Sequence, residues 1–296
     1  MNKKCARAPL LSGILLFLFA VGISLAASPL SALLTVSFIN VGQGECILIQ
    51  SPNGHAMLID AGPLAAGPKI TYYLKSRYIS KIDALIVTAP RNNHVGGLAT
   101  IIYTFPVDRV YLPNISGESA LYQETLKSLK NRRLTTLAAK AGALIHLDPA
   151  LVIEVLAPLK NHYSFRGDYS TVIKISYGKN SFLFMGDAGE VSEKEMLKAN
   201  DNLRADVLKV GRHGSLEATT EKFLQAVAPK HAVISVGVNN RYGYPDEDTL
   251  EKLEEAGADI YRTDINGTVK VTSDGKKISV TADRANVGLG GPVGRK

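Results

Sequence analysis

The fold is decided by the stretch Ile82-Asp83-Ala84-Leu85-Ile86-Val87-Thr88-Ala89-Pro90-Arg91-Asn92-Asn93-His94-Val95-Gly96-Gly97-Leu98. Its apolar run from Ala84 to Val87 predicts a buried strand, and the polar residues that follow predict a turn ending in His94. A helix is expected to start near Val95. In α/β proteins, functional residues lie where a strand ends and a helix begins, so this turn is the first candidate site.

This stretch resembles the metallo-β-lactamase fold family, in which a His-x-His/Asp-x-Asp-His set of metal ligands follows such a strand. It is especially similar to the soluble, DNA-processing domain of the ComEC competence proteins, where the run has the form Leu-Thr-His-Pro-Asp-x-Asp-His-x-Gly-Gly. His94 keeps its place in this pattern, and the other ligand positions hold Ala89, Arg91 and Asn93. Matching positions are Thr88, Pro90, Gly96 and Gly97.

Two downstream motifs carry further ligand positions of the family. The run Phe182–Ala188 is similar to the family's strand-Gly-Asp-Ala, whose Asp, here Asp187, bridges two metal ions. The run Ala205–Ser215 resembles Ala-Asp-Val-Leu-Lys-Val-Pro-His-His-Gly-Ser; it keeps His213 and has Arg212 in place of a His.

Three more segments extend the resemblance, which covers nearly all of residues 34–282. Phe38–Glu45 is similar to the ComEC run Phe-x-Asp-Val-Gly-Gln-Gly-Asp, and Asn240–Pro245 to Arg-Tyr-Gly-His-Pro with Tyr244 in place of the His. Asp60 ends a predicted strand, where the family has an Asp that supports the site from behind. A plain turn residue is the alternative interpretation of Asp60.

The order of predicted elements favours two packed sheets with helices outside. Antiparallel strands come first, and strand–helix units follow from Asp206 onwards. The resemblance implies the αββα sandwich of two mixed sheets, within one domain at residues 33–282. The predicted elements include a helix at Ser116–Arg132 with Ser116 as its N-cap, a single helix at Val95–Thr104 and a strand at Leu144–Leu147.

Residues 1–26 predict an export signal or an N-terminal anchor. Lys3, Lys4 and Arg7 precede an apolar segment at residues 10–26, which ends in small residues suited to cleavage. Uncleaved, this segment would hold the protein on the outer face of the cytoplasmic membrane; cleaved, it would leave the protein extracellular. The formal charge of +7 permits a polyanionic partner without requiring one. Residues 283–296 predict a flexible tail.

The ligand set implied by the resemblance is incomplete. A two-metal hydrolase needs imidazole nitrogens and carboxylate oxygens converging on two ions. Alanine has no donor atom and arginine repels a cation, so the first metal position should be empty. The second keeps His94, Asp187 and His213, with Asn93 as a weak oxygen donor, which implies at most one Zn or Mn ion. The alternative is no ion, with Asp187 capping a turn and both histidines hydrogen-bonded.

Arg91 and Arg212 both fall at the vacated first-metal position of the family pattern. Their guanidinium groups are therefore predicted to bind a phosphate or carboxylate in its place. The alternative is two solvent-exposed surface arginines.

Three functions follow from these patterns. The first is a binding protein with impaired or lost hydrolysis that keeps a cleft for nucleic acid or another polyanion. The second is a single-metal phosphodiester hydrolase acting on DNA outside the membrane, with Asp187 as its catalytic residue. The third is a structural partner of other proteins in DNA uptake. The sequence leaves open whether the chain is an enzyme.

Overall fold

The computed structural model describes residues 33–115, 119–199 and 202–284. The predicted signal or anchor at residues 1–26, and nearly all of the predicted tail at 283–296, lie outside this part of the chain. Within the described ranges, no helix combines the length and the apolar character needed to span a membrane.

The strands form two mixed sheets, which confirms the predicted fold class. The eight-stranded sheet has the order β14 (Ile278–Ala282), β13 (Val269–Ser273), β1 (Leu34–Phe38), β2 (Ile47–Gln50), β3 (Ala56–Ile59), β4 (Ile82–Ile86), β5 (Val107–Pro113) and β6 (Thr135–Ala139). The six-stranded sheet has the order β12 (Asp259–Arg262), β11 (His231–Ile234), β10 (Val207–Lys209), β9 (Asn180–Phe184), β8 (Val172–Tyr177) and β7 (Val152–Ala157). In the first sheet, neighbouring strands from β14 to β3 are antiparallel and those from β3 to β6 are parallel. In the second sheet, neighbouring strands from β12 to β9 are parallel and those from β9 to β7 are antiparallel.

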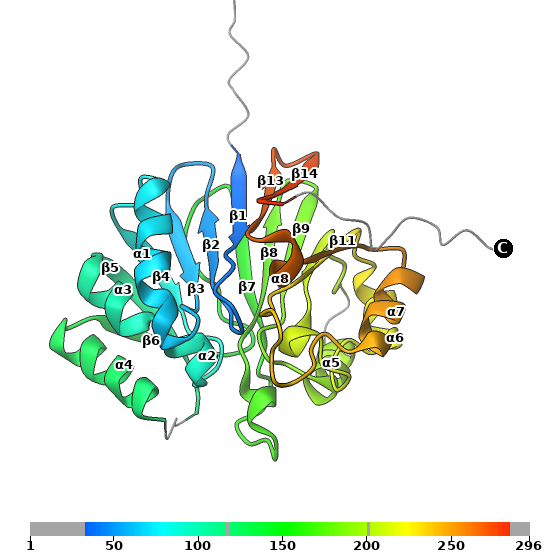
Figure 1. Ribbon diagram of the computed structural model, residues 1–296, viewed down its shortest axis with the longest axis horizontal. Coiled ribbons are helices and arrows are strands. Elements are labelled where there is room, and N and C mark those ends of the chain that lie inside the picture. Colours follow the sequence, from blue (N-terminus) through cyan, green and yellow to red (C-terminus); the bar gives the residue numbers. More distant parts are fainter. Residues whose placement is uncertain (1–32, 116–118, 200–201, 285–296) are drawn as a thin grey trace, which may run out of the picture. The chain divides into compact units, whose positions relative to one another are not determined.

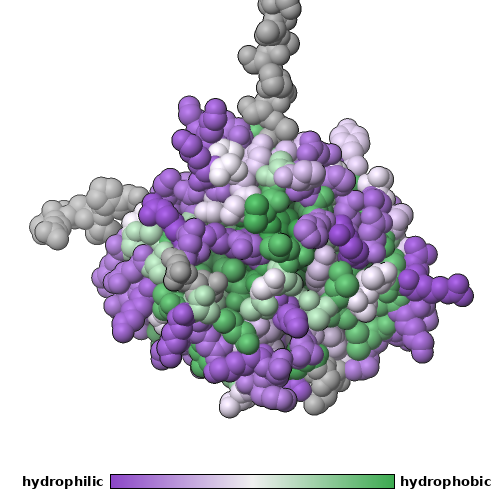
Figure 2. Space-filling view, turned by 180° about the vertical axis from the view of Figure 1, so that it is seen from behind, coloured by the Kyte–Doolittle hydropathy of each residue, from purple (hydrophilic) through white to green (hydrophobic). Residues whose placement is uncertain are grey.

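The central core lies between the two sheets and is built by the alternation of side chains along each strand. Ile47 and Ile49 of β2 face Phe182 and Phe184 of β9 within one buried cluster, whereas Leu48 points to the opposite face of its sheet. Apolar residues on both faces of a strand are typical of a sheet that is covered on both sides. Hydrophilic residues dominate the rim of the surface in Figure 2, and hydrophobic residues gather near its middle.

Helices cover the outer face of each sheet and complete the sandwich (Figure 1). Leu48 of the first sheet packs with Ile70 and Ile101 from two of its covering helices. In the second sheet, Leu183 packs with Phe223. The first sheet is covered by α1 (Gly67–Ser76), α3 (Leu98–Thr104) and α4 (Ala120–Asn131), and the second by α5 (Glu190–Ala199), α6 (Glu221–Val227) and α7 (Glu247–Glu255).

The predicted helix Val95–Thr104 is two helices, which corrects the expectation of one. The first, α2 (Asn92–Val95), begins before Val95, and α3 starts after Gly96 and Gly97. A Cβ atom on Gly96 would lie 2.2 Å from the backbone nitrogen of Leu64, and one on Gly97 2.4 Å from the carbonyl oxygen of Ala61. Only glycine fits there, so the pair brings the turn against the residues that follow β3.

Other local predictions were wrong. Ser119, not Ser116, caps α4 by accepting a hydrogen bond from the backbone of Tyr122; Ser116 itself lies outside the described ranges. The predicted strand Leu144–Leu147 forms only one bridge, from Leu144 to Glu154. The strand β6, an edge strand with mostly exposed residues, and the helix α5 had no counterpart in the prediction.

Candidate metal centre and anion-binding cleft

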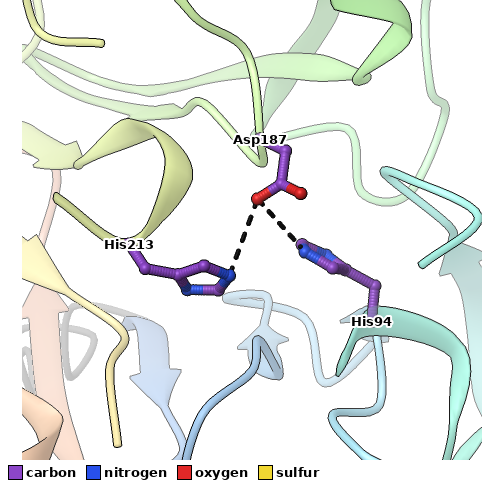
Figure 3. A group of neighbouring side chains, drawn as sticks. All are labelled: His94, Asp187 and His213. Atoms are coloured by element: carbon purple, nitrogen blue, oxygen red, sulfur yellow. Dashed lines mark ion pairs between the residues drawn. The ribbon is translucent and has the colours of Figure 1, made fainter. Parts of the chain in front are cut away.

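Three predicted ligands converge where strands of both sheets end. His94 lies on α2 after β4, Asp187 follows β9, and His213 lies in the short helix η3 (Gly211–Gly214) after β10. Asp187 Oδ1 lies 3.3 Å from His94 Nε2 and 3.6 Å from His213 Nε2. The two imidazole rings approach the carboxylate from different sides (Figure 3). All three side chains are buried.

Asp60 is hydrogen-bonded to His94. Asp60 Oδ2 accepts a hydrogen bond from His94 Nδ1 at 2.6 Å. The carboxylate also accepts from the backbone nitrogen of Thr88 at 2.8 Å and from its hydroxyl at 2.5 Å. With Nδ1 engaged, His94 Nε2 faces Asp187. This is the carboxylate–histidine arrangement that supports metal ligands in proteins.

His213 is held by backbone geometry and by two neighbours. Its Nδ1 donates to the carbonyl oxygen of Ser235 at 2.7 Å, so Nε2 carries a lone pair. That lone pair accepts from Asn93 Nδ2 at 2.9 Å, so Asn93 presents its amide nitrogen to His213. Arg212 and His213 both have left-handed backbone conformations, with φ of 46° and 57°. Such strain costs of order 1–3 kcal/mol per residue and is concentrated at functional sites.

Arg91 and Arg212 lie beside this group. Arg91 Nη1 donates to Asp187 Oδ2 at 2.9 Å, and Oδ2 is the oxygen not used towards the histidines. Arg212 pairs with Glu217, whose side chain is largely exposed. Both guanidinium carbons lie over the ring of Phe165, at 5.9 Å for Arg91 and 4.3 Å for Arg212. The structure therefore brings the two predicted arginines to one place.

The charges in this cluster balance in the absence of a metal ion. Burial opposes protonation of His94, but the carboxylates of Asp187 and Asp60 outweigh it and raise its pKa to about 10. Burial would raise the pKa of Asp187, but His94, His213 and Arg91 hold it well below its usual range. Two carboxylates thus face protonated His94 and Arg91. His213 stays neutral, because burial, Lys209 and His94 lower its pKa to about 4, although Asp187 acts in the opposite direction.

His94, Asp187 and His213 form a donor set that fits one metal ion. His94 Nε2 and Asp187 Oδ1 are buried without a hydrogen-bond partner in the described part of the chain. These atoms and a ring nitrogen of His213 lie within 4.8 Å of one another. Imidazole and carboxylate ligands suit Zn and, with more oxygen donors, Mn. Arg91 places a cation on the other oxygen of Asp187, Oδ2.

A cleft of about 460 Å³ opens over these residues. Tyr244 lines it and stacks on Tyr242, with ring centroids 5.5 Å apart. A second pocket, also about 460 Å³, adjoins the cleft and shares part of its lining. The cleft is lined by Pro90, Arg91, Asn92, Asn93, Ser119, Asp187, Arg212, His213, Arg241, Tyr242 and Tyr244.

Several contributors to the site were not identified from the sequence. Phe165 comes from a loop that matches no motif, and its apolar side chain gives no sign of a role. The contribution of Ser235 is a backbone oxygen, which its residue type does not reveal. Glu45 and Lys209 lie inside quoted motifs, yet their pairing across 164 residues was not anticipated.

The titration of the two histidines provides a direct prediction. Both have a pKa near 6.5 in an unfolded chain. Protonated His94 should therefore stabilise the metal-free fold fully below about pH 6.5, and this contribution should be lost as the pH rises through about 10. His213 should destabilise the fold as the pH falls from about 6.5 to about 4, because the unfolded chain binds the extra proton.

NMR of the ring resonances, together with denaturant unfolding across this range, measures both effects. A pKa of His94 near 6.5 in the folded protein would contradict the assignment of a protonated His94.

The chain is similar to several known proteins. Residues 39–238 match the family model of the metallo-beta-lactamase superfamily. ComE operon protein 3 of Bacillus subtilis is 30% identical over 252 residues, which are 79% of this chain and 32% of that protein. Competence protein ComA of Neisseria gonorrhoeae is 26% identical over 233 residues, 78% of this chain and 31% of that protein. The chain thus spans about a third of the length of these relatives.

The fold recurs in solved structures. The metallo-beta-lactamase fold protein YhfI from Bacillus subtilis superimposes with a TM-score of 0.51, at 12% identity, over 77% of this chain and 95% of YhfI. At this identity the likeness shows the fold alone. The family match covers well over half of the sequence, and the chain therefore belongs to the metallo-beta-lactamase superfamily.

Proposed function

We propose that this protein is an exported, ComEC-like member of the superfamily that binds nucleic acid or a similar phosphate-containing polyanion in its cleft, with hydrolysis impaired or lost. One observation carries the proposal: Arg91 is bonded to Asp187 Oδ2 on the side away from the two histidines. A fixed side-chain cation supplies positive charge to the bridging carboxylate at the position where hydrolases of this fold use a metal ion.

The charges around the cleft support an anionic ligand. Arg91, Arg212 and Arg241 line it, and Asp187 is its one acidic lining residue among those described. Arg91 is 41% exposed, so the rest of its guanidinium group is accessible from the cleft. Arginine binds phosphate oxygens bidentately, and the bond gains strength where water is partly excluded.

The names of the relatives support a nucleic-acid ligand. One is a product of the ComE operon and another is a competence protein. Because the chain spans only about a third of each, a role in competence or DNA uptake belongs to the proposal. Export rests on the sequence of residues 1–26 alone.

The second candidate is a single-metal phosphodiester hydrolase. It is favoured by His94 Nε2 and Asp187 Oδ1, which are buried without a hydrogen-bond partner among the described residues and lie beside neutral His213. An ion held by these three residues would supply Lewis-acid chemistry at a phosphate. Arg91 and Arg212 would hold the phosphate oxygens and steady their developing charge. Metal-dependent cleavage of an oligonucleotide that disappears in Asp187→Ala would establish this candidate over the first.

The double variant Arg91→Met/Arg212→Met tests the proposed function. We expect its affinity for a labelled oligonucleotide to fall by at least about tenfold, since two charge-assisted hydrogen-bonding groups are removed at about 1.5–3 kcal/mol each. The slope of log affinity against log salt should become shallower by about 0.7 for each phosphate of a single strand that the variant no longer neutralises.

Fluorescence anisotropy at several salt concentrations provides both quantities. The matched control is Arg132→Met/Arg133→Met, which removes two exposed arginines beyond α4 and should bind like the wild type. Equal affinity of the cleft variant and this control would refute binding through Arg91 and Arg212.

A further inference from the structure

A tyrosine pair forms one wall of the cleft. The rings of Tyr242 and Tyr244 are stacked, with an interplanar angle of 14° and centroids 5.5 Å apart. Tyr242 remains 51% exposed. The exposed guanidinium group of Arg241 lies 4.9 Å from the centre of the Tyr242 ring.

The loop that carries the pair is fixed by Asn240. Its Oδ1 accepts from the backbone nitrogens of Tyr242 at 3.2 Å and Tyr244 at 3.1 Å. Its Nδ2 donates to the carbonyl oxygens of Gly237 at 3.1 Å and Tyr244 at 2.6 Å. One side chain thus holds both ends of the turn, and the aromatic surface is preorganised before any ligand arrives.

Tyr242 lines two neighbouring hollows. One is the cleft with Arg91 and Arg212. The other is the adjoining pocket, which Pro63, Leu64 and Leu121 also line. Cationic groups beside an aromatic surface and an apolar hollow match the alternating phosphates and bases of an unpaired strand.

We propose that Tyr242, backed by Tyr244, is a stacking platform for a nucleobase, and that the cleft therefore selects single-stranded over double-stranded nucleic acid. This inference rests on the proposed function and specifies which form of nucleic acid the cleft binds. The base takes the ring face that Arg241 covers in the free protein, and the displaced guanidinium group turns to a phosphate. Bases in a duplex are already stacked on one another, so a duplex gains nothing from this surface.

Tyr242→Leu tests the platform, because it keeps an apolar side chain and removes the aromatic face. With a labelled single-stranded oligonucleotide, we expect binding about 5- to 150-fold weaker, since stacking on an aromatic side chain contributes 1–3 kcal/mol per base. Tyr242→Phe should bind like the wild type. The salt dependence should stay unchanged in both variants, because neither removes a group that binds phosphate.

Two further probes separate stacking from charge. An abasic strand of the same length has the phosphates without the bases, and we expect the wild type to bind it as weakly as Tyr242→Leu binds the normal strand. A duplex should bind equally to the wild type and to Tyr242→Leu. Tyr72→Leu, at an exposed tyrosine on α1, is the control for losing a surface aromatic.

The outcomes distinguish this inference from the proposed function. If Tyr242→Leu binds the single strand like the wild type, or if the abasic strand binds as tightly as the normal one, the platform is refuted. A loss of affinity in Arg91→Met/Arg212→Met in the same assays would then leave the proposed function intact. Failure of the wild type to bind any of these oligonucleotides overturns both.

Discussion

Replacing Lys209 with methionine should lower the free energy of unfolding by about 3–5 kcal/mol, because it leaves a buried carboxylate without its partner. Lys209 Nζ donates to Glu45 Oε2 and, at 3.1 Å, to the carbonyl oxygen of Gly186. Both charged side chains are fully buried. The other Glu45 oxygen has no hydrogen-bond partner in the described ranges, so no second hydrogen bond would stabilise the remaining carboxylate.

The pair connects the two halves of the sandwich beneath the candidate site. Glu45 precedes β2 of the first sheet, and Lys209 ends β10 of the second. Gly186 is the residue before Asp187, so Lys209 also fixes the turn that presents the central carboxylate. Loss of Lys209 should therefore loosen the site as well as destabilise the fold.

The double variant Lys209→Met/Glu45→Leu provides the control. Replacing both charges with apolar groups of similar size removes the uncompensated carboxylate, and we expect most of the stability to return. Urea unfolding of the wild type, Lys209→Met, Glu45→Leu and the double variant completes a double-mutant cycle. A Lys209→Met protein within about 1 kcal/mol of wild-type stability would contradict the assignment of a buried ion pair.

Replacing Arg91 with methionine should raise the affinity of the protein for Zn²⁺ by roughly tenfold or more, since a fixed positive charge beside Asp187 opposes a divalent cation. Arg91 is partly exposed, so solvent screens its repulsion of the zinc ion. The change in zinc affinity should therefore be smaller than it would be in a dry interior. His94 must also lose its proton on binding, so affinity should weaken as the pH falls. The wild type should bind at most one ion per chain.

Matched variants isolate the charge of Arg91. Arg91→Lys retains it and should keep the low affinity, whereas His213→Ala removes a ligand and should abolish specific binding. Calorimetry of zinc binding to chelator-treated protein measures the stoichiometry and the affinity together. Weaker zinc binding in Arg91→Met would show that Arg91 assists the metal and does not replace it.

The fold and the candidate residues could be predicted from the sequence to different extents. The apolar runs within Cys46–Gln50 and Ala84–Val87 predicted strands, because a short continuous apolar run is a local property of the sequence. The edge strand β6 has mostly exposed residues and gives no such signal. Gly96 divides a predicted helix through its close approach to Leu64, which no local pattern contains.

In the site too, the identity of some residues could be predicted from local motifs, whereas their charge state and contacts depend on the tertiary structure. His94, Asp187 and His213 were named from their motifs, and the fold brings them together. Their electrostatic state depends on Asp60, Lys209 and the geometry of Arg91, which come from distant segments of the chain. The roles of Phe165 and Tyr242 depend on which side chains lie opposite them, so they became visible only in three dimensions.

We expect the cleft to bind a polyanion without needing a metal ion. The affinity of chelator-treated protein for a single-stranded oligonucleotide, measured over a range of salt concentrations, tests this expectation. The structure predicts specific binding that weakens steeply with salt and does not change when chelator is added in excess. Binding that appears only after Zn²⁺ or Mn²⁺ is restored would contradict this expectation and favour the single-metal hydrolase.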